Sequence, residues 1–127
     1  HPSLKITGLS GNSKAGMAMA DVYPHLRHLD LPHLTTIEEM SFDDVEIVFC
    51  GLPHATSQKI VATLPEHVRV IDMSADFRLR DVADYEKWYG KPHAAPDLQK
   101  TAVYGLTEFY RGNGPIRFTA FDCRRAH

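Results

Sequence analysis

Val45-Glu46-Ile47-Val48-Phe49-Cys50 and Val68-Arg69-Val70-Ile71-Asp72-Met73 are two short runs rich in apolar and β-branched residues. Runs of this kind are typical of strands buried in a parallel sheet. Between them, Thr56 is placed to cap a helix that runs to about Leu64, where a proline follows. Residues 45–73 therefore predict strand, helix, strand, which is the βαβ unit of a parallel sheet.

The residues before this unit predict one more strand and one helix. Alternation of apolar and small or polar residues over 4–9 predicts a strand. Residues 17–26 predict a short helix that Pro24 distorts, because proline has no backbone N–H. Residues 27–36 are rich in His and Pro, and we expect them to be irregular.

The residues after the unit extend the pattern. Residues 81–90 predict a helix with a stripe of aromatic side chains, which we expect to serve packing. Pro92 and Pro96 are expected to bracket a loop, and residues 102–104 to form a last strand. The chain thus predicts an α/β fold, a parallel sheet with flanking helices.

Composition narrows the class of protein. The chain has 127 residues, 43% hydrophobic and 24% charged, as in an ordinary globular domain. Acidic residues outnumber basic ones, 16 to 14, which argues against nucleic acid or a membrane surface as a partner, since both favour a basic field. No apolar run approaches the ~20 residues that span a bilayer. Two cysteines are too few for a disulfide scaffold, so we expect reduced thiols and a cytoplasmic protein.

Three chemically distinctive segments follow predicted strands. They are Ser10 to Gly16, Gly51 to His54, and Ser74 to Arg78. Ligands of an open parallel sheet bind beyond the carboxyl ends of its strands. We therefore expect the three segments to lie along one edge of the sheet and to line one crevice.

The first segment combines small residues with hydroxyl and basic side chains. It contains Ser10, Ser13 and Lys14 and no acidic residue. In nucleotide-binding sheets an acid at this place selects a free ribose hydroxyl, whereas basic or hydroxyl side chains accept a 2′-phosphate. The segment therefore fits a phosphate; the alternative is a solvated surface loop.

The second segment has a backbone suited to close approach of a ligand. Gly51 has no side chain, and Pro53 stiffens the turn. His54 lies just before the predicted helix, whose first N–H groups favour anionic ligands. The alternative is an ordinary strand-to-helix turn in which His54 is a polar partner.

In the third segment, Asp76 and Arg78 are two residues apart and share a face of extended backbone. An arginine beside a cleft can bind a carboxylate or a phosphate with two parallel hydrogen bonds. The alternative is a structural Asp–Arg pair that holds the loop.

Neither a metal site nor a reactive thiol at Cys50 is supported by the sequence. His25, His28 and His33 are close in sequence, but their spacing matches no strong zinc pattern, and we expect no metal. Cys50 lies in a predicted buried strand and is expected to be unreactive.

Taken together, these segments resemble the N-acetyl-gamma-glutamyl-phosphate reductases of arginine biosynthesis. The resemblance covers residues 1 to 111. The motifs that carry it are, in chain order, Leu52-Pro53-His54, Asp72-Met73-Ser74-Ala75-Asp76-Phe77-Arg78-Leu79, Tyr85-x-x-Trp88-Tyr89-Gly90, His93-x-x-Pro96 and Val103-Tyr104-Gly105-Leu106-x-Glu108.

The resemblance implies a Rossmann-type NADP-binding domain joined to a second, catalytic and dimerisation domain. It implies a soluble homo-oligomeric oxidoreductase that reduces N-acetyl-glutamyl phosphate with NADPH to N-acetylglutamate semialdehyde and phosphate. A cysteine thiolate attacks the acyl phosphate and forms a thioester, and a histidine acts as acid or base.

The resemblance also implies roles for individual residues. The cofactor-binding positions it implies are Ser10, Ser13, Lys14, Leu52, Pro53, His54 and Ser74. Asp76 and Arg78 fall on the substrate side, and Arg78 is the expected contact for an anion.

The chain departs from the family pattern at both ends. The glycine-rich turn of the family would lie before residue 1, and the second domain beyond residue 127, so we expect an incomplete Rossmann-type sheet and a fragment of the enzyme. Residues 112–127 do not match the family and are expected to form an atypical tail. Cys123 in this tail is the candidate nucleophile. The alternative function is a non-catalytic nucleotide-binding or interaction fragment.

Overall fold

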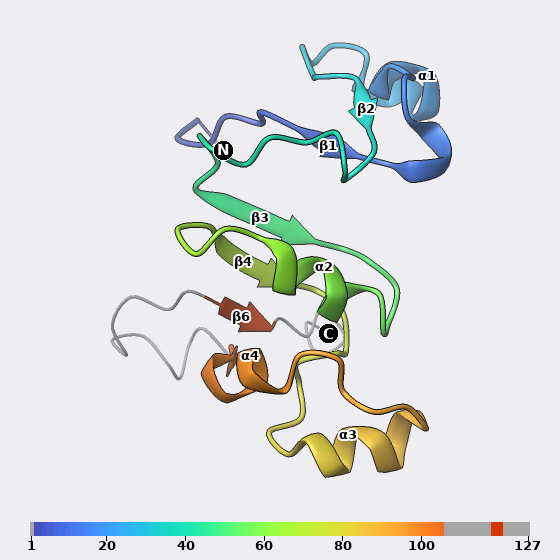
Figure 1. Ribbon diagram of the computed structural model, residues 1–127. Helices are drawn as coiled ribbons and strands as arrows, with labels where there is room; N and C mark the ends of the chain where they lie inside the picture. Colours follow the sequence, from blue (N-terminus) through green and yellow to red (C-terminus); the bar gives the residue numbers. More distant parts are fainter. Residues whose placement is uncertain (1, 106–117, 121–127) are drawn as a thin grey trace. The chain divides into compact units, whose positions relative to one another are not determined.

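The computed structural model describes residues 2–105 and 118–120. The chain divides into two compact units, His1–Val45 and Glu46–His127. Figure 1 gives the order of their helices and strands. Each unit is described by itself.

A short pair of parallel strands organises the first unit. β1 (Leu9–Ser10) lies beside β2 (Leu34–Thr35), with Leu9 opposite Leu34. The predicted strand over residues 4–9 is wrong for residues 4–8, and β1 includes Ser10 instead. Leu4 and Ile6 are about half exposed, so their side chains lack the packing that a buried strand gives.

The segment between β1 and β2 is mostly short turns. A 3₁₀ turn spans Asn12–Lys14, α1 spans Met19–Val22, and a second 3₁₀ turn spans Pro24–Leu26. The single helix predicted over residues 17–26 is wrong: the α-helix stops before Pro24, and a tighter turn begins with it. β2 was not predicted, since it lies in a stretch expected to be irregular.

The predicted βαβ unit is confirmed in the second compact unit. β3 (Ile47–Cys50) and β4 (Arg69–Asp72) are parallel neighbours, with Cys50 opposite Asp72. α2 (Ser57–Thr63) connects them, as Figure 1 shows. Thr56 does precede α2, but its side chain makes no capping hydrogen bond, so the predicted cap is wrong in its chemistry.

Two further strands complete a four-stranded parallel sheet. β5 (Val103–Tyr104) confirms a strand within the predicted residues 102–104, but it is not the last strand of the sheet as predicted. β6 (Phe118–Ala120) lies between β4 and β5, so the order is β3-β4-β6-β5, with every neighbouring pair parallel. β6 falls within the residues expected to be an atypical tail, where no strand was predicted.

Two helices follow β4. α3 (Val82–Tyr89) confirms the predicted helix; the Asp81 carboxylate caps its start, and Gly90 ends it with a φ of 68°. α4 (Pro96–Thr101) was not predicted, because Pro96 was interpreted as part of a loop. Proline is in fact well suited to the first turn of a helix, where its missing N–H costs nothing.

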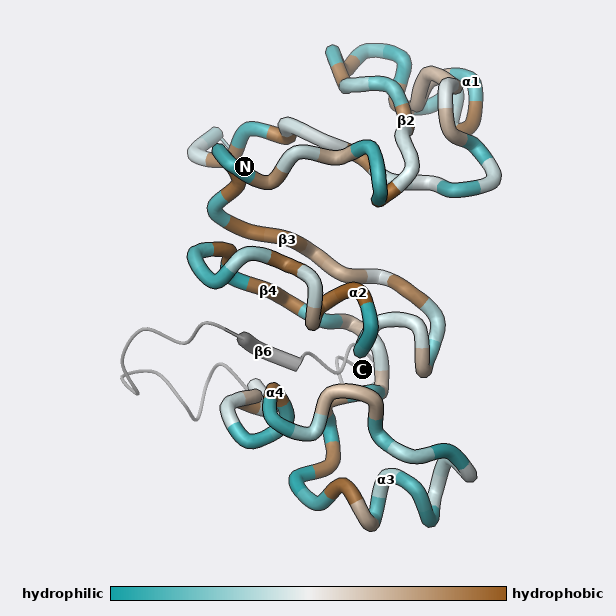
Figure 2. The backbone as a smooth tube through the Cα atoms, viewed as in Figure 1, coloured by the Kyte–Doolittle hydropathy of each residue, from teal (hydrophilic) through white to brown (hydrophobic). Residues whose placement is uncertain are grey.

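The core of the second unit includes residues of the sheet, in which β3 and the middle of β4 are brown, the colour of hydrophobic residues, in Figure 2. Its buried apolar side chains are Cys50, Val61, Leu64, Val68, Val70, Ala75, Phe77, Tyr85 and Ala95. Phe49 is 58% exposed, so the prediction that β3 is buried throughout is wrong on one face. Trp88 is 74% exposed, so the prediction that the aromatic stripe serves packing is wrong for this residue.

Candidate functional site

In the first unit, backbone hydrogen bonds hold the turn after β1 against β2. The Gly11 amide donates to the Thr35 carbonyl at 3.0 Å, and the Gly16 amide donates to the Leu34 carbonyl at 2.7 Å. Gly16 has a φ of 85°, a conformation that strongly favours glycine. The turn between these two anchors is therefore fixed in shape.

The predicted phosphate-binding residues lie on this turn. Ser10 is the last residue of β1, while Ser13 and Lys14 belong to the 3₁₀ turn. All three are exposed, and none of their side chains hydrogen-bonds to another residue in the described part of the chain. Two hydroxyls and one ammonium group thus face solvent without an acidic neighbour in the turn, a donor set that fits a phosphate.

In the second unit, the sheet ends in a buried carboxylate. Asp72 closes β4, and its side chain is fully buried. It accepts hydrogen bonds from Ser57 Oγ at 2.8 Å, from Ser74 N at 3.1 Å and from Ser74 Oγ at 2.6 Å. Three neutral donors therefore replace the water that burial has removed.

Cys50 lies beside this group. Its Sγ is 3.2 Å from Ser57 Oγ. Burial raises the pKa of the Cys50 thiol, with a smaller raising effect from the Asp72 charge, while the Ser57 hydrogen bond lowers it. A protonated buried thiol is a poor nucleophile, as the sequence analysis expected.

Ser74, a predicted cofactor contact, is occupied by the protein itself. Its hydroxyl donates to Asp72 Oδ2 and accepts from the Asp76 amide at 3.1 Å. The side chain is buried. These contacts shape the loop after β4, and a nucleotide contact by Ser74 stays a prediction.

Asp76 is the second buried carboxylate, 0% exposed. Its Oδ1 accepts from the Ala55 amide at 2.9 Å and from the Tyr85 hydroxyl at 2.8 Å, and its Oδ2 accepts from the Gln58 amide at 3.3 Å. Burial, and then the hydrogen bond to the Asp76 carboxylate, raise the pKa of Tyr85. This placement favours a structural role over the predicted contact with substrate, because no carboxylate oxygen reaches the surface.

His54 lies at the surface and joins the two loops that follow β3 and β4. Its Nδ1 accepts a hydrogen bond from the Ala75 amide at 3.2 Å, which leaves the proton of the neutral ring on Nε2. Leu52 is half-buried and Pro53 is exposed on the same loop. The structure thus brings together the second and third predicted segments.

Arg78 is half-buried, and its Nε donates to the Ser74 carbonyl at 3.2 Å. The guanidinium is thereby oriented by the loop after β4. The structural pairing of Asp76 with Arg78, considered above as the alternative, is not what satisfies Asp76, whose donors are Ala55, Gln58 and Tyr85.

Sequence reasoning missed two residues of this network. His93 lies across the loop, with its Nε2 3.0 Å from the Asp76 carbonyl oxygen and its Nδ1 accepting from the Ala95 amide at 3.1 Å. Its ring also packs edge-on against Phe77 and Tyr85. His93 and Tyr85 were quoted as motif residues, but no spacing in the sequence indicates that both meet Asp76.

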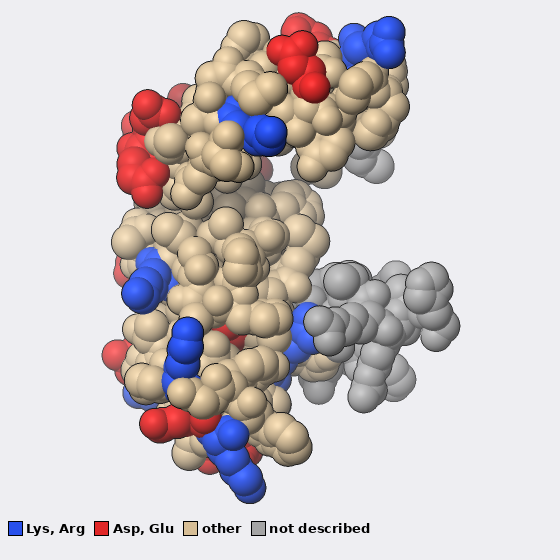
Figure 3. Space-filling view, turned by 90° about the vertical axis from the view of Figure 1, so that its right-hand side faces the viewer, with Lys and Arg blue, Asp and Glu red and all other residues tan. Residues whose placement is uncertain are grey.

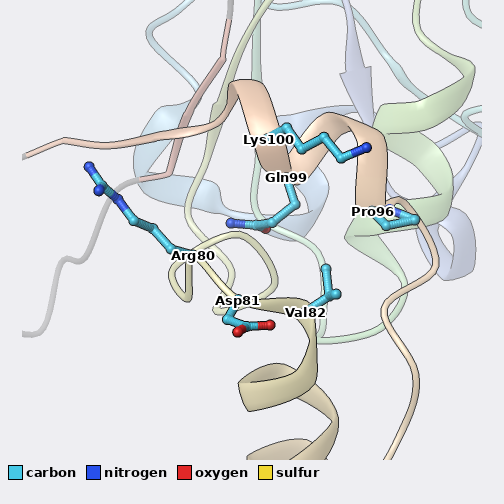
Figure 4. Close-up of a pocket in the computed structure, with 6 residues that line it drawn as sticks. All are labelled: Arg80, Asp81, Val82, Pro96, Gln99 and Lys100. Carbon is cyan, nitrogen blue, oxygen red and sulfur yellow. The ribbon is translucent and has the colours of Figure 1, made fainter.

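A pocket of about 310 Å³ lies near the starts of α3 and α4. Figure 4 shows the residues that line it: Arg80, Asp81, Val82, Pro96, Gln99 and Lys100. The ammonium group of Lys100 is 2.7 Å from the Asp97 carboxylate. The lining contains no residue of the predicted site, so this pocket is separate from the two loops described above.

Neither a metal-binding cluster nor a membrane-spanning helix is found among the described residues. Within 2–105 and 118–120, no three His, Cys, Asp or Glu side chains are grouped to hold a metal ion. No helix in that part of the chain is long and apolar enough to cross a bilayer. Both basic and acidic side chains are exposed on the face drawn in Figure 3.

The predicted common crevice and the predicted nucleophile both stay predictions. The turn with Ser13 and the loop with His54 belong to different compact units, so a common crevice stays a prediction. Cys123, the candidate nucleophile, lies outside the described residues.

Comparison with known proteins agrees with the motifs. The family model described as semialdehyde dehydrogenase, NAD binding domain, matches residues 1–113. A Cereibacter sphaeroides protein is 68% identical over 111 residues, which are 87% of this chain and 32% of that protein. Proteins of Rhodobacter capsulatus and Paracoccus denitrificans are 65% and 57% identical over the same shares.

All three relatives are named N-acetyl-gamma-glutamyl-phosphate reductase. The resemblance drawn from the motifs is therefore confirmed. The chain spans about a third of the length of these relatives.

Proposed function

The chain belongs to the semialdehyde dehydrogenase family through its NAD-binding domain, and on that premise we propose that it is part of an N-acetyl-gamma-glutamyl-phosphate reductase. The complete enzyme would reduce N-acetyl-glutamyl phosphate to N-acetylglutamate semialdehyde and phosphate. The observation that carries the proposal is the 68% identity over 111 residues to a relative of that name. The buried loop network after β3 and β4 supports it, because ligands of parallel sheets bind at those strand ends.

NADP is the cofactor that we propose. The turn of the first unit offers Ser10, Ser13 and Lys14 as exposed donors and contains no carboxylate that would repel a 2′-phosphate. Leu52, Pro53 and His54 are proposed to line the dinucleotide at the end of β3, and the loop that the buried Ser74 side chain shapes after β4 is proposed to face it. The bound nicotinamide supplies the hydride.

The chain's own residues then bind and orient the reactants. Arg78, oriented through the Ser74 carbonyl, is proposed to bind the anionic substrate. Asp76 was predicted as a substrate contact; its burial assigns it in this proposal to supporting the loop. Cys123 is proposed as the thiolate nucleophile on the resemblance alone.

The test is the reverse reaction on the complete protein. We expect reduction of NADP⁺ in the presence of N-acetylglutamate semialdehyde, dependent on added phosphate, with much slower reduction of NAD⁺. Aspartate semialdehyde serves as the control substrate and should not be oxidised at a comparable rate. Absence of turnover, together with retained NADPH binding, would overturn the enzyme assignment in favour of a non-catalytic nucleotide-binding module.

A pair of cysteine variants tests the nucleophile separately. Cys123→Ala should abolish turnover while NADPH still binds, because covalent catalysis needs the thiolate. Cys50→Ala is the matched control, since Cys50 is buried and protonated. Full activity of Cys123→Ala would remove that residue from the mechanism.

We further propose a cytoplasmic homo-oligomer for the complete protein. The location rests on the proposed biosynthetic role, and the oligomeric state rests on the resemblance to the reductase family. Size-exclusion chromatography with light scattering would measure the oligomeric state, and a monomer across the working concentration range would contradict it.

A further inference from the structure

Ala55 holds an unfavourable backbone conformation in the turn between β3 and α2. Its φ is 64°, and no other residue except glycine has a positive φ in the described part of the chain. In this left-handed region the β-carbon crowds the carbonyl oxygen, so alanine adopts it only when its surroundings enforce it. Ala55 directly follows His54, a proposed cofactor contact.

A buried carboxylate, that of Asp76, binds the backbone of this turn. Asp76 Oδ1 accepts the Ala55 N–H at 2.9 Å, and the Tyr85 hydroxyl donates to the same oxygen at 2.8 Å. Oδ2 accepts the Gln58 N–H of α2 at 3.3 Å. Because Asp76 is fully buried, water does not compete for these charge-assisted hydrogen bonds.

Two further contacts hold this arrangement on either side. The Ala75 amide donates to His54 Nδ1 at 3.2 Å, which ties the loop after β3 to the loop after β4. His93 Nε2 lies 3.0 Å from the Asp76 carbonyl oxygen, which fixes the backbone of Asp76 itself. His93 therefore fixes the backbone of Asp76 from outside the strained turn, whereas the His54 contact ties the turn itself to the loop after β4.

We propose that Asp76 is a positioning residue that, with the Tyr85 hydroxyl, keeps Ala55 left-handed and thereby presents the Leu52–His54 loop to the nucleotide. The inference rests on the proposed function, which assigns that loop to the cofactor. Without the carboxylate, Ala55 relaxes to a negative φ, and the loop conformation that binds the nucleotide becomes a minor state. The apparent affinity for the nucleotide then falls in proportion to the fraction of protein that keeps this conformation.

The test is a mutant cycle in the complete protein. Asp76→Ala removes the acceptor, and Ala55→Gly removes the backbone strain, since glycine adopts a positive φ readily. Asp76→Asn, which keeps the side-chain shape, is the second variant in case Asp76→Ala does not fold. Asp97→Ala is the matched control, because Asp97 is exposed and pairs only with Lys100 among the described residues.

We expect Asp76→Ala to raise the NADPH dissociation constant about tenfold, which corresponds to the free-energy cost of holding one alanine in the left-handed conformation. We expect kcat to change less than about threefold. Adding Ala55→Gly should recover most of the lost NADPH affinity. The same Ala55→Gly change should not restore any NADPH affinity that Asp72→Asn loses, because Asp72 is a neighbouring buried carboxylate that does not contact Ala55. Unchanged affinity in Asp76→Ala, or equal rescue of both carboxylate variants, would overturn the proposal.

Amide hydrogen exchange separates this proposal from the proposed function. In the protein without cofactor, Asp76→Ala should speed exchange of the Ala55 and Gln58 amides, whereas Asp97→Ala should not. Unchanged exchange at both amides overturns the proposal whatever the cofactor. If the wild-type protein fails to bind NADPH while Asp76→Ala still speeds amide exchange as expected, the proposed function and the nucleotide part of the inference are overturned. The role of Asp76 in holding Ala55 is then retained.

Discussion

Replacing Asp72 with alanine should destabilise the second compact unit more than any exposed substitution in it. The change removes the acceptor of three hydrogen bonds, from Ser57 Oγ, Ser74 N and Ser74 Oγ. Asp72 is fully buried, so water does not reach the donors that are left. Asp72→Asn is the milder variant, since it keeps one accepting oxygen in the same shape.

The size of the effect follows from these contacts. A hydrogen bond to a charged group contributes about 1.5–3 kcal/mol, and a buried donor left without a partner costs about 1–3 kcal/mol. The contributions share one carboxylate and are not additive. Asp72→Ala also removes the free-energy cost of burying the Asp72 charge, which partly offsets these losses. We therefore expect a loss of about 3–5 kcal/mol for Asp72→Ala and about half of that for Asp72→Asn.

Pulse proteolysis across a urea series measures the difference, because cleavage reports the unfolded population. Asp97→Ala is the control, an exposed carboxylate whose loss should change stability by no more than about 0.5 kcal/mol. A loss below about 1 kcal/mol for Asp72→Ala would refute the reasoning, since it would mean that the three hydrogen bonds only offset the cost of burying the charge.

Four further outcomes follow from the described residues. Gly90→Ala should cost about 1 kcal/mol in urea unfolding, because Gly90 ends α3 with a φ of 68°. Asp81→Ala should also cost about 1 kcal/mol in the same assay, through loss of its hydrogen bond from the Ala83 amide. Burial raises the pKa of Cys50 above its ordinary 9.0, so its contribution to stability is complete below that pH and is lost as pH rises through the folded pKa; Cys50→Ala should flatten this alkaline loss in unfolding curves. Ser13→Asp should weaken NADPH binding about tenfold in a fluorescence titration and leave NADH binding within about threefold; equal weakening of both would contradict the phosphate assignment.

The local sequence predicted the elements whose stabilising contacts lie close by in the chain. β3, α2 and β4 were predicted because their apolar runs are separated by clear turn residues. α4 was missed because Pro96 is ambiguous: the same residue opens a helix or ends one. β6 was missed because a three-residue strand is defined by its neighbours β4 and β5, and pairing partners are not visible in a short run.

The candidate site shows the same limit. The motifs predicted roles for His54, Asp76 and Arg78. The residue type alone does not distinguish a side chain that contacts a ligand from a buried side chain that supports the loop. The burial of Asp76 depends on Tyr85, nine residues further on, and on Ala55, 21 residues back. Only the fold brings these three together, and only the backbone angle of Ala55 shows what the carboxylate holds.

The position of β6 has a consequence for how the chain folds during synthesis. In the described part of the chain, β5 hydrogen-bonds to β6 alone, and β6 also completes the inner edge of β4. Residues 103–104 therefore cannot pair with their neighbouring strand until residues 118–120 have left the ribosome. Until then, β3 and β4, joined by α2, are the described strands of this sheet that can pair, so a translational pause before β6 should leave β5 available to chaperones.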